Sequence, residues 1–319
     1  MVSNSCLSFV TDGDHESYRL ATTALETIAV SRRHLSIMEI AWAAALGTAQ
    51  EDVATVAALH RLVEDLRVID RIWPFFCYYR PWLGELRKRQ FLPMCLNNVP
   101  RRHTEGLESR LLEVCIQYLL LCEIGDVDLL SEENVAYEEL PESIDLFSDD
   151  DKSLDDETSD TWEACEDDMI RYDPTDRGFG ELFVFASTYW LEYFGAVSDL
   201  DMLPRLEDIE KLCQAGSRRL HNWITQNSRP GCTVEQRFVF DSSLYDPLSI
   251  TSLYGSEAML QHMLENADLK SDKYLPTSVL NAAGQILQWG DLSRLGFLAT
   301  SKHASRIRNF DFFRMAVMQ

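Results

Sequence analysis

The sequence predicts a mainly α-helical protein. In several long segments, apolar side chains recur at the three- and four-residue spacing of an amphipathic helix. Ser36 stands three residues before Glu39 at the start of an apolar run, which is the spacing of a capping box. Residues 245–269 have the pattern of two short helices joined at Gly255. These patterns favour a chain built from packed helices.

The first hundred residues predict a winged-helix-like domain, residues 1–100. Residues 18–46 contain two helices separated by the polar letters SRRH, and a third amphipathic stripe covers 51–66. The following residues, 67–96, are aromatic and interrupted by three prolines, which suits short strands or turns. Three helices followed by short strands is the order of elements in a winged helix.

The middle of the chain predicts a connecting helix, 101–122, and then an acidic insertion, 123–176. Asp and Glu occupy 20 of the 46 positions in 123–168, and Lys152 is the only basic residue there. Such a segment repels itself and holds too few apolar residues to form a core, so we predict that the insertion is disordered.

After the insertion, residues 177–236 predict a helical arm. A polar-faced helix is expected over 204–226, with Pro204 in its first turn. An aromatic helix precedes it, and its aromatic side chains are predicted to be core residues rather than a ligand site. They are Phe183, Phe185, Tyr189, Trp190 and Tyr193.

The final segment, 237–319, resembles degenerate ankyrin repeats. An ankyrin repeat is about 33 residues long and begins with the letters TPLHxA. Here Asp246 takes the capping place before Pro247, and Gly255 is expected to end the first helix in the left-handed conformation. The core face of the second helix is expected at Met259, Leu260, Met263 and Leu264. Later segments of similar sequence recur at about the same period, and they place Ala283, Gly290 and Ala316 at equivalent positions of the following repeats.

Ankyrin arrays bind partners on a concave face formed by first helices and loops, so we predict a partner-binding surface there. The expected residues are Tyr245, Ser249, Ser252, Leu253, Tyr254 and Ser256.

Charge and composition restrict the partners and the compartment. The formal net charge is −23, with 52 acidic against 29 basic side chains, which argues against nucleic acid and anionic lipid as partners. The N-terminus lacks the basic and apolar regions of a signal peptide, and no apolar run is long enough to span a membrane. The eight cysteines form no CxxC pair and are expected to be reduced, which favours a cytoplasmic protein.

No candidate catalytic, cofactor-binding or metal-ligating residues emerge from the sequence. The paired carboxylates lie in the acidic insertion, where no apolar scaffold would shift their pKa values. The acidic runs lack the glycine and closing glutamate of an EF-hand loop. We therefore predict a protein that is not an enzyme and needs no cofactor.

Four segments together resemble the region that follows the NTPase module in fungal NACHT/ankyrin-repeat receptor proteins. The family has a helix followed by RRPLSLEELAEAL, and the matching positions here are Ser31, Arg32, Arg33, Leu35, Glu39, Ile40 and Ala44. LESRLLEVCIQYLLL and FVFASTYWLEYF are similar to two later family helices, and the ankyrin-like tail comes last, in the family's order.

The family's phosphate loop, GxxxxGK[ST], is absent, and the chain contains no Gly-Lys pair. The resemblance therefore implies a non-enzymatic interaction or regulatory module that binds another protein, without nucleotide binding. Two alternatives stay open. The chain could be an accessory protein or small-molecule-binding enzyme of fungal specialised metabolism, with ligands in an aromatic cleft, or a truncated gene product without an independent role.

Overall fold

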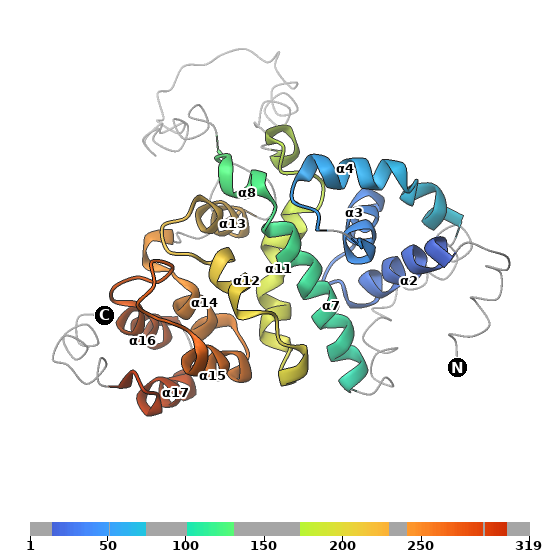
Figure 1. Cartoon of the computed structure of the whole chain (residues 1–319). Helices are drawn as coiled ribbons and strands as arrows, with labels where there is room; N and C mark the ends of the chain where they lie inside the picture. The colour runs from blue at the N-terminus through green and yellow to red at the C-terminus, as the bar shows by residue number, and fades with distance from the viewer. Residues whose placement is uncertain are drawn as a thin grey trace, which may run out of the picture.

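The computed structural model of the chain is helical. It describes residues 15–50, 52–74, 101–130, 173–229, 241–289 and 291–304. Within those residues every regular element is an α-helix or a 3-10 helix, so the prediction of a mainly α fold is confirmed (Figure 1).

Two central helices form the middle of the molecule. α7 (Arg101–Leu119) and α11 (Phe183–Ala196) pack against each other along their length (Figure 1). Three helices lie on one side of this pair: α2 (His15–Val30), α3 (Ile37–Thr48) and α4 (Val56–Asp65). The other side holds α12 (Leu206–Leu212), α13 (Arg218–Ser228), α14 (Pro247–Tyr254), α15 (Glu257–Asn266), α16 (Ser278–Trp289) and α17 (Leu295–Thr300).

Side-chain caps explain where the N-terminal helices begin. The Ser36 hydroxyl accepts a hydrogen bond from the Glu39 amide at 3.1 Å, and the Glu39 carboxylate accepts one from the Ser36 amide at 2.7 Å. This confirms the predicted capping box. The third helix was expected from residue 51 but begins at 56, because Thr55 accepts from the Ala58 amide and acts as the N-cap.

The described part of the predicted strand-and-turn segment differs from the expectation. Arg67 has a φ of 47°, which ends α4, and residues 68–74 then form another helical segment. Val68 and Ile72 are fully buried, so this segment packs as an amphipathic helix rather than as a strand. The rest of 67–96, from residue 75 onward, lies outside the described residues.

Both edges of the predicted acidic insertion belong to the folded body. Residues 122–126 form α8 (Cys122–Asp126), where Ile124 is fully buried and the Glu123 carboxylate accepts from the Val56 amide at 2.9 Å. At the other edge, Asp173 caps the 3-10 helix η2 (Pro174–Arg177) by accepting a hydrogen bond from the Thr175 amide at 2.8 Å. The insertion boundaries of 123 and 176 are therefore corrected, because burial and hydrogen bonds hold both edges. The residues between, 131–172, lie outside the described part.

The single helix predicted over 204–226 is two helices. α12 ends at Leu212, and α13 begins after Ser217, whose hydroxyl accepts from the Leu220 amide at 3.2 Å. Gly216 between them has a φ of +67°, a conformation that favours glycine. The helical spacing of apolar residues continues through this region of the sequence, but the cap residue and the glycine end one helix and start the next.

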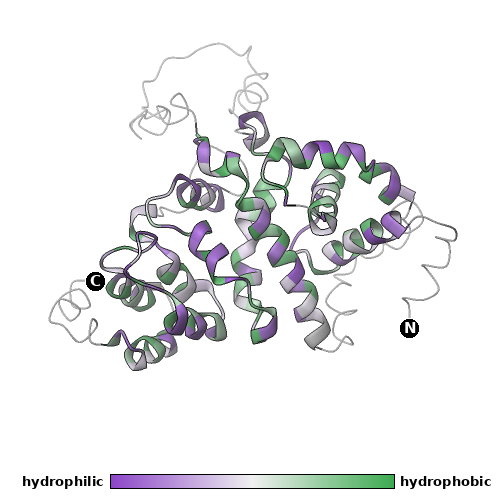
Figure 2. Cartoon of the chain, viewed as in Figure 1, coloured by the Kyte–Doolittle hydropathy of each residue, from purple (hydrophilic) through white to green (hydrophobic). Residues whose placement is uncertain are grey.

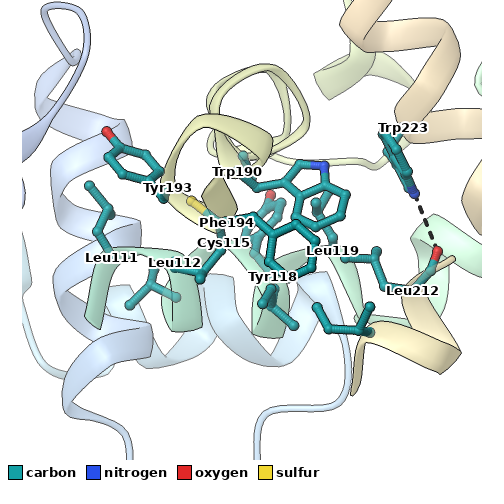
Figure 3. Close-up of a cluster of buried hydrophobic side chains, with 14 of the residues drawn as sticks. Leu111, Leu112, Cys115, Tyr118, Leu119, Trp190, Tyr193, Phe194, Leu212 and Trp223 are labelled. Carbon is teal, nitrogen blue, oxygen red and sulfur yellow. Dashed lines mark hydrogen bonds between the residues drawn. The ribbon is translucent and has the colours of Figure 1, made fainter. Parts of the chain in front are cut away.

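The core is continuous across the central pair. α7 contributes Cys115, Tyr118 and Leu119, which meet Trp190 and Phe194 of α11 (Figure 3). The Trp223 indole stands edge-on to Trp190, with ring centroids 5.0 Å apart, and donates to the Leu212 carbonyl at 3.2 Å (Figure 3). Hydrophobic residues follow the length of α11 (Figure 2), and four of its five predicted core aromatics are buried, with Tyr189 half-buried.

The C-terminal helices form two successive hairpins, α14–α15 and α16–α17. The first helices, α14 and α16, pack against each other, and so do the second helices, α15 and α17. Asp246 caps α14 and Pro247 occupies its first position, as predicted. The predicted core face of α15 is also confirmed: Met259, Leu260, Met263 and Leu264 are buried.

Candidate partner-binding site

The structure buries four of the six residues predicted to face a partner. Tyr245, Ser249, Ser252 and Ser256 are each at most 4% exposed, whereas Leu253 and Tyr254 are half-buried. The expectation that all six line an open surface is therefore corrected. A partner can reach Leu253 and Tyr254, and their role in binding stays a prediction.

Two of the three buried serines, Ser249 and Ser256, serve the chain's own helices. The Asp246 carboxylate, which is fully buried, accepts from both the amide and the hydroxyl of Ser249 at 2.8 Å and from the Leu275 amide at 3.1 Å. Ser256 caps α15 by accepting from the Met259 amide. These side chains satisfy helix ends inside the protein, which explains why they are not presented to solvent.

Tyr254 lies on a seam where α11, α13 and α14 meet. The seam is an apolar cleft of about 10 Å³ lined by Leu191, Trp223, Ile224, Asn227, Ile250 and Tyr254. Of these residues, Leu191, Asn227 and Tyr254 are half-buried and the others are buried. This volume is far below the ~300 Å³ of a typical ligand pocket, so the seam offers a contact surface rather than a small-molecule cavity.

Hydrogen bonds and burial hold the seam in place. The Asn227 amide group donates to the carbonyls of Ser187 and Thr188 at 3.1 and 3.2 Å.

Burial raises the pKa of Tyr254, and it raises the pKa of the neighbouring Tyr245 to about 12. Both phenols are therefore neutral at physiological pH, and Tyr254 can donate a hydrogen bond to a partner from an otherwise apolar surface.

Two glycines allow the close approach of α11 and α14. A Cβ atom at Gly195 would lie 2.8 Å from the Tyr254 carbonyl oxygen, which is too close for any side chain. A Cβ atom at Gly255 would meet the Thr251 carbonyl oxygen at 2.8 Å and the Phe194 ring at 3.0 Å. Gly255 has a φ of −67°, so the predicted left-handed conformation was wrong. Crowding, rather than backbone handedness, favours glycine there.

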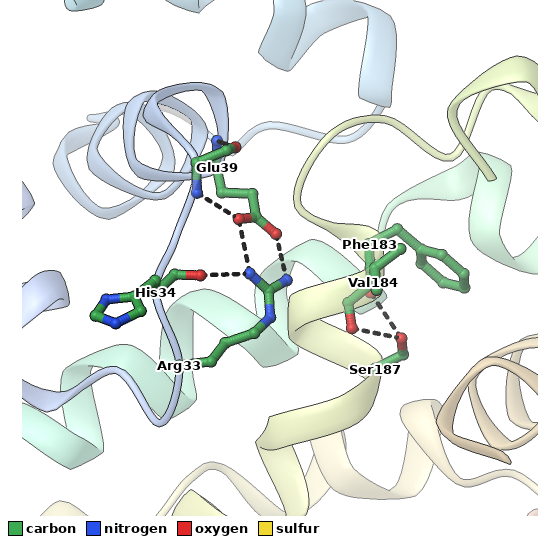
Figure 4. A network of polar contacts seen from close by, with 7 residues as sticks. Arg33, His34, Glu39, Phe183, Val184 and Ser187 are labelled. Carbon is green, nitrogen blue, oxygen red and sulfur yellow. Dashed lines mark hydrogen bonds and ion pairs between the residues drawn. The ribbon is translucent and has the colours of Figure 1, made fainter. Parts of the chain in front are cut away.

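A second cluster, missed as a site in the sequence, joins the N-terminal helices to α11. Arg33 forms a two-pronged ion pair with Glu39, with contacts of 2.9 and 2.5 Å (Figure 4). The Arg33 guanidinium also lies 5.3 Å from the ring centroid of Phe185, and the Arg32 guanidinium lies 5.2 Å from that of Tyr193. In the sequence, the only sign of this cluster is the pair of adjacent arginines between two predicted helices. Their aromatic partners lie about 150 residues later in the chain, so the sequence does not show the contact.

Larger hollows occur elsewhere. An open groove of about 310 Å³ lies between α2, the end of α3 and α7, and the Glu26–Arg110 ion pair at 2.9 Å stands on its rim. A shallow open depression of about 540 Å³ is lined by Asp128, Arg218, His221 and Ser242 among others. Within the described ranges, no group of three or more His, Cys, Asp or Glu side chains is arranged to hold a metal ion.

Comparison with known proteins gives no relative. No family model matches the sequence, and comparisons with curated proteins and with solved structures give no significant match. Among the described residues, none of the helices has the length and apolar character needed to cross a membrane.

Proposed function

We propose that this chain is a non-enzymatic protein–protein interaction or regulatory module, related to the region after the NTPase in fungal NACHT/ankyrin receptors. The observation that carries the proposal is the layered packing of the two C-terminal hairpins, first helix on first helix and second on second. Tandem helical repeats stack in this way, because each repeat buries its apolar face only against its neighbours. Such arrays commonly act by binding proteins.

The proposed contact surface is the seam around Tyr254 together with Leu253. A half-buried tyrosine beside aliphatic side chains combines a rigid apolar contact with one hydrogen-bond donor, which is the composition of many binding hot spots. The acidic chain would favour a protein partner that carries basic residues around such a contact. We place the module in the cytoplasm, which microscopy of a fluorescently tagged chain would check.

Affinity capture from cells that naturally express the chain tests the proposal. The variant combines Leu253→Ala with Tyr254→Ala, and the matched control combines Leu25→Ala with Tyr18→Ala, an exposed leucine–tyrosine pair on α2. Both variants are first checked for wild-type helicity and melting temperature. We expect partners that bind the wild type and the control to be lost from the seam variant. Retention of every partner by a folded seam variant would refute the proposed surface.

A further inference from the structure

The groove between α2, α7 and the end of α3 has the dimensions of a small-molecule site. Its volume is about 310 Å³, at the lower end of the range for ligand pockets, which begins at about 300 Å³. The three helices pack against one another, so the walls of the groove belong to the folded body (Figure 1). None of these helices lines the seam around Tyr254, so the groove is a separate feature of the molecule.

The floor of the groove is apolar. Leu46 of α3 and Leu107, Leu111 and Val114 of α7 line it, and all four side chains are buried parts of the hydrophobic core. Packing on the core side fixes these side chains in place. An aliphatic group that lies on this floor would remove apolar surface from water, which favours binding.

A glycine keeps the end of the groove at α3 open. Gly47 lies inside α3, where glycine is about 1 kcal/mol less favourable than alanine. A Cβ atom at this position would lie 3.1 Å from the Thr23 methyl carbon and 3.2 Å from a methyl carbon of Val114. Both of these residues line the groove, so a side chain at position 47 would occupy the space between its walls.

The charged side chains that line the groove leave a net negative charge. They are Glu26, Arg110 and Glu113. The Arg110 guanidinium donates to the Glu26 carboxylate at 2.9 Å, so these two charges balance. Glu113 is exposed and accepts a hydrogen bond at 3.3 Å from the neutral amide of Gln117, and it forms no ion pair with any residue that the structure describes. This carboxylate beside an apolar floor is complementary to a cation with an aliphatic body.

The end of α3 adds to this negative potential. Gly47 and Ala49 line the groove at the C-terminal end of the helix, where the last carbonyl groups carry partial negative charge. The Arg19 guanidinium donates to the Thr48 carbonyl at 3.1 Å, so this helix end already binds one cationic donor from the chain itself.

We propose that the groove binds a small organic cation, with an ammonium or guanidinium group on a short aliphatic chain. The aliphatic part lies on Leu111 and Val114, and the cationic group pairs with Glu113. Such a ligand would stabilise the folded state, because it binds a site built from three packed helices that the unfolded chain does not have. The site would give the protein a regulatory ligand in addition to a protein partner.

Titration of the full chain, followed by methyl NMR, tests the proposal. Hexylammonium is the probe, and hexan-1-ol and hexanoate carry comparable alkyl chains with no charge and with the opposite charge. We expect hexylammonium to shift the methyl signals of Leu111 and Val114 in a saturable way and to bind at least about tenfold more tightly than the other two. Absence of these shifts, or equal binding of the alcohol, would overturn the proposal. Tighter binding of acetyl-lysine amide than of hexylammonium would assign the cation to a protein side chain and would also overturn it.

A matched pair of variants tests the role of the carboxylate. Glu113→Gln removes the charge and keeps the shape of the side chain. Glu265→Gln makes the same change on α15, where an exposed glutamate also accepts from a glutamine one turn away, Gln261, at 3.0 Å. We expect Glu113→Gln to weaken hexylammonium binding by about tenfold and to leave the binding of hexan-1-ol unchanged, whereas Glu265→Gln should alter neither. Equal affinity of the two variants for hexylammonium would refute the assignment of a cation site.

Discussion

The hydroxyl of Tyr193 in α11 donates a hydrogen bond to the carbonyl of Val30, the last residue of α2, at 3.1 Å. The same oxygen accepts from the Arg32 amide at 3.2 Å. One phenol therefore satisfies two backbone groups where the first helix ends, although it lies more than 160 residues away in the sequence. This contact couples the path of the N-terminal helices to the central pair.

Replacement of Tyr193 by phenylalanine should lower the free energy of unfolding by about 1–3 kcal/mol. The ring would still fill the core, but two backbone groups would lose their partner in a buried place. Urea denaturation followed by circular dichroism measures the change. Tyr189→Phe, on the same helix but half-buried, is the control and should change stability by less than about 0.5 kcal/mol. An equal effect of both variants would count against the hydrogen bonds as the cause.

Arg33 should not be replaceable by lysine. The guanidinium makes a two-pronged contact with Glu39 and lies over Phe185, and an ammonium group provides neither the fork nor the flat stacking surface. We expect both Arg33→Ala and Arg33→Lys to cost about 1–2 kcal/mol, since the pair is partly shielded from solvent. Thermal melts of both variants provide the measurement. Near-wild-type stability of Arg33→Lys would show that charge alone is sufficient.

Local signals in the sequence predicted the local structure well. The Ser36–Glu39 capping box and the Asp246–Pro247 helix start depend on residues within three positions of each other, and both are found as expected. The aromatic residues of α11 were recognised as core from their spacing. In each case, the physical cause is contained in a few consecutive residues, so one sequence is enough.

Contacts between distant segments were the part that could not be predicted. Ser249 and Ser252 are polar and lie in first-helix positions, so the sequence favoured exposure, yet both are fully buried. The Asp246 carboxylate accepts hydrogen bonds from the Ser249 amide and hydroxyl, and α16, which follows later in the chain, packs against the helix that carries both serines. Gly255 was likewise predicted to adopt a left-handed backbone conformation. The sequence does not show that the Phe194 ring lies so close that a Cβ atom at this position would be crowded.

Alkaline pH should destabilise the fold through its buried tyrosines. Burial raises the pKa of Tyr118, Tyr193 and Tyr274, and that of Tyr245 to about 12, whereas an unfolded tyrosine ionises near pH 10. The unfolded state therefore loses protons first, and stability should fall as pH rises above about 10. Absorbance at 295 nm should show these phenols ionising together with the loss of helicity. Full ionisation before any unfolding would contradict their burial.

A methyl group at Gly195 should separate α11 from α14. Helix propensity alone predicts that alanine in place of glycine stabilises a helix by about 1 kcal/mol. At Gly195, however, the new Cβ would lie 2.8 Å from the Tyr254 carbonyl oxygen, so one helix end must move. We expect Gly195→Ala to lower the free energy of unfolding by about 1–3 kcal/mol, as overpacking does.

Gly296 in α17 is the matched control for this substitution. Apart from its chain neighbours and the backbone of α17 itself, no heavy atom lies within 4 Å of a Cβ placed there, so Gly296→Ala should follow helix propensity and raise stability by up to about 1 kcal/mol. Urea denaturation of the two variants side by side compares them directly. Opposite signs would establish that the contact at Tyr254 controls the effect at Gly195. A gain in stability for both variants would mean that α14 can move away from Gly195 at little cost in free energy. The seam would then be less rigid than its hydrogen bonds imply.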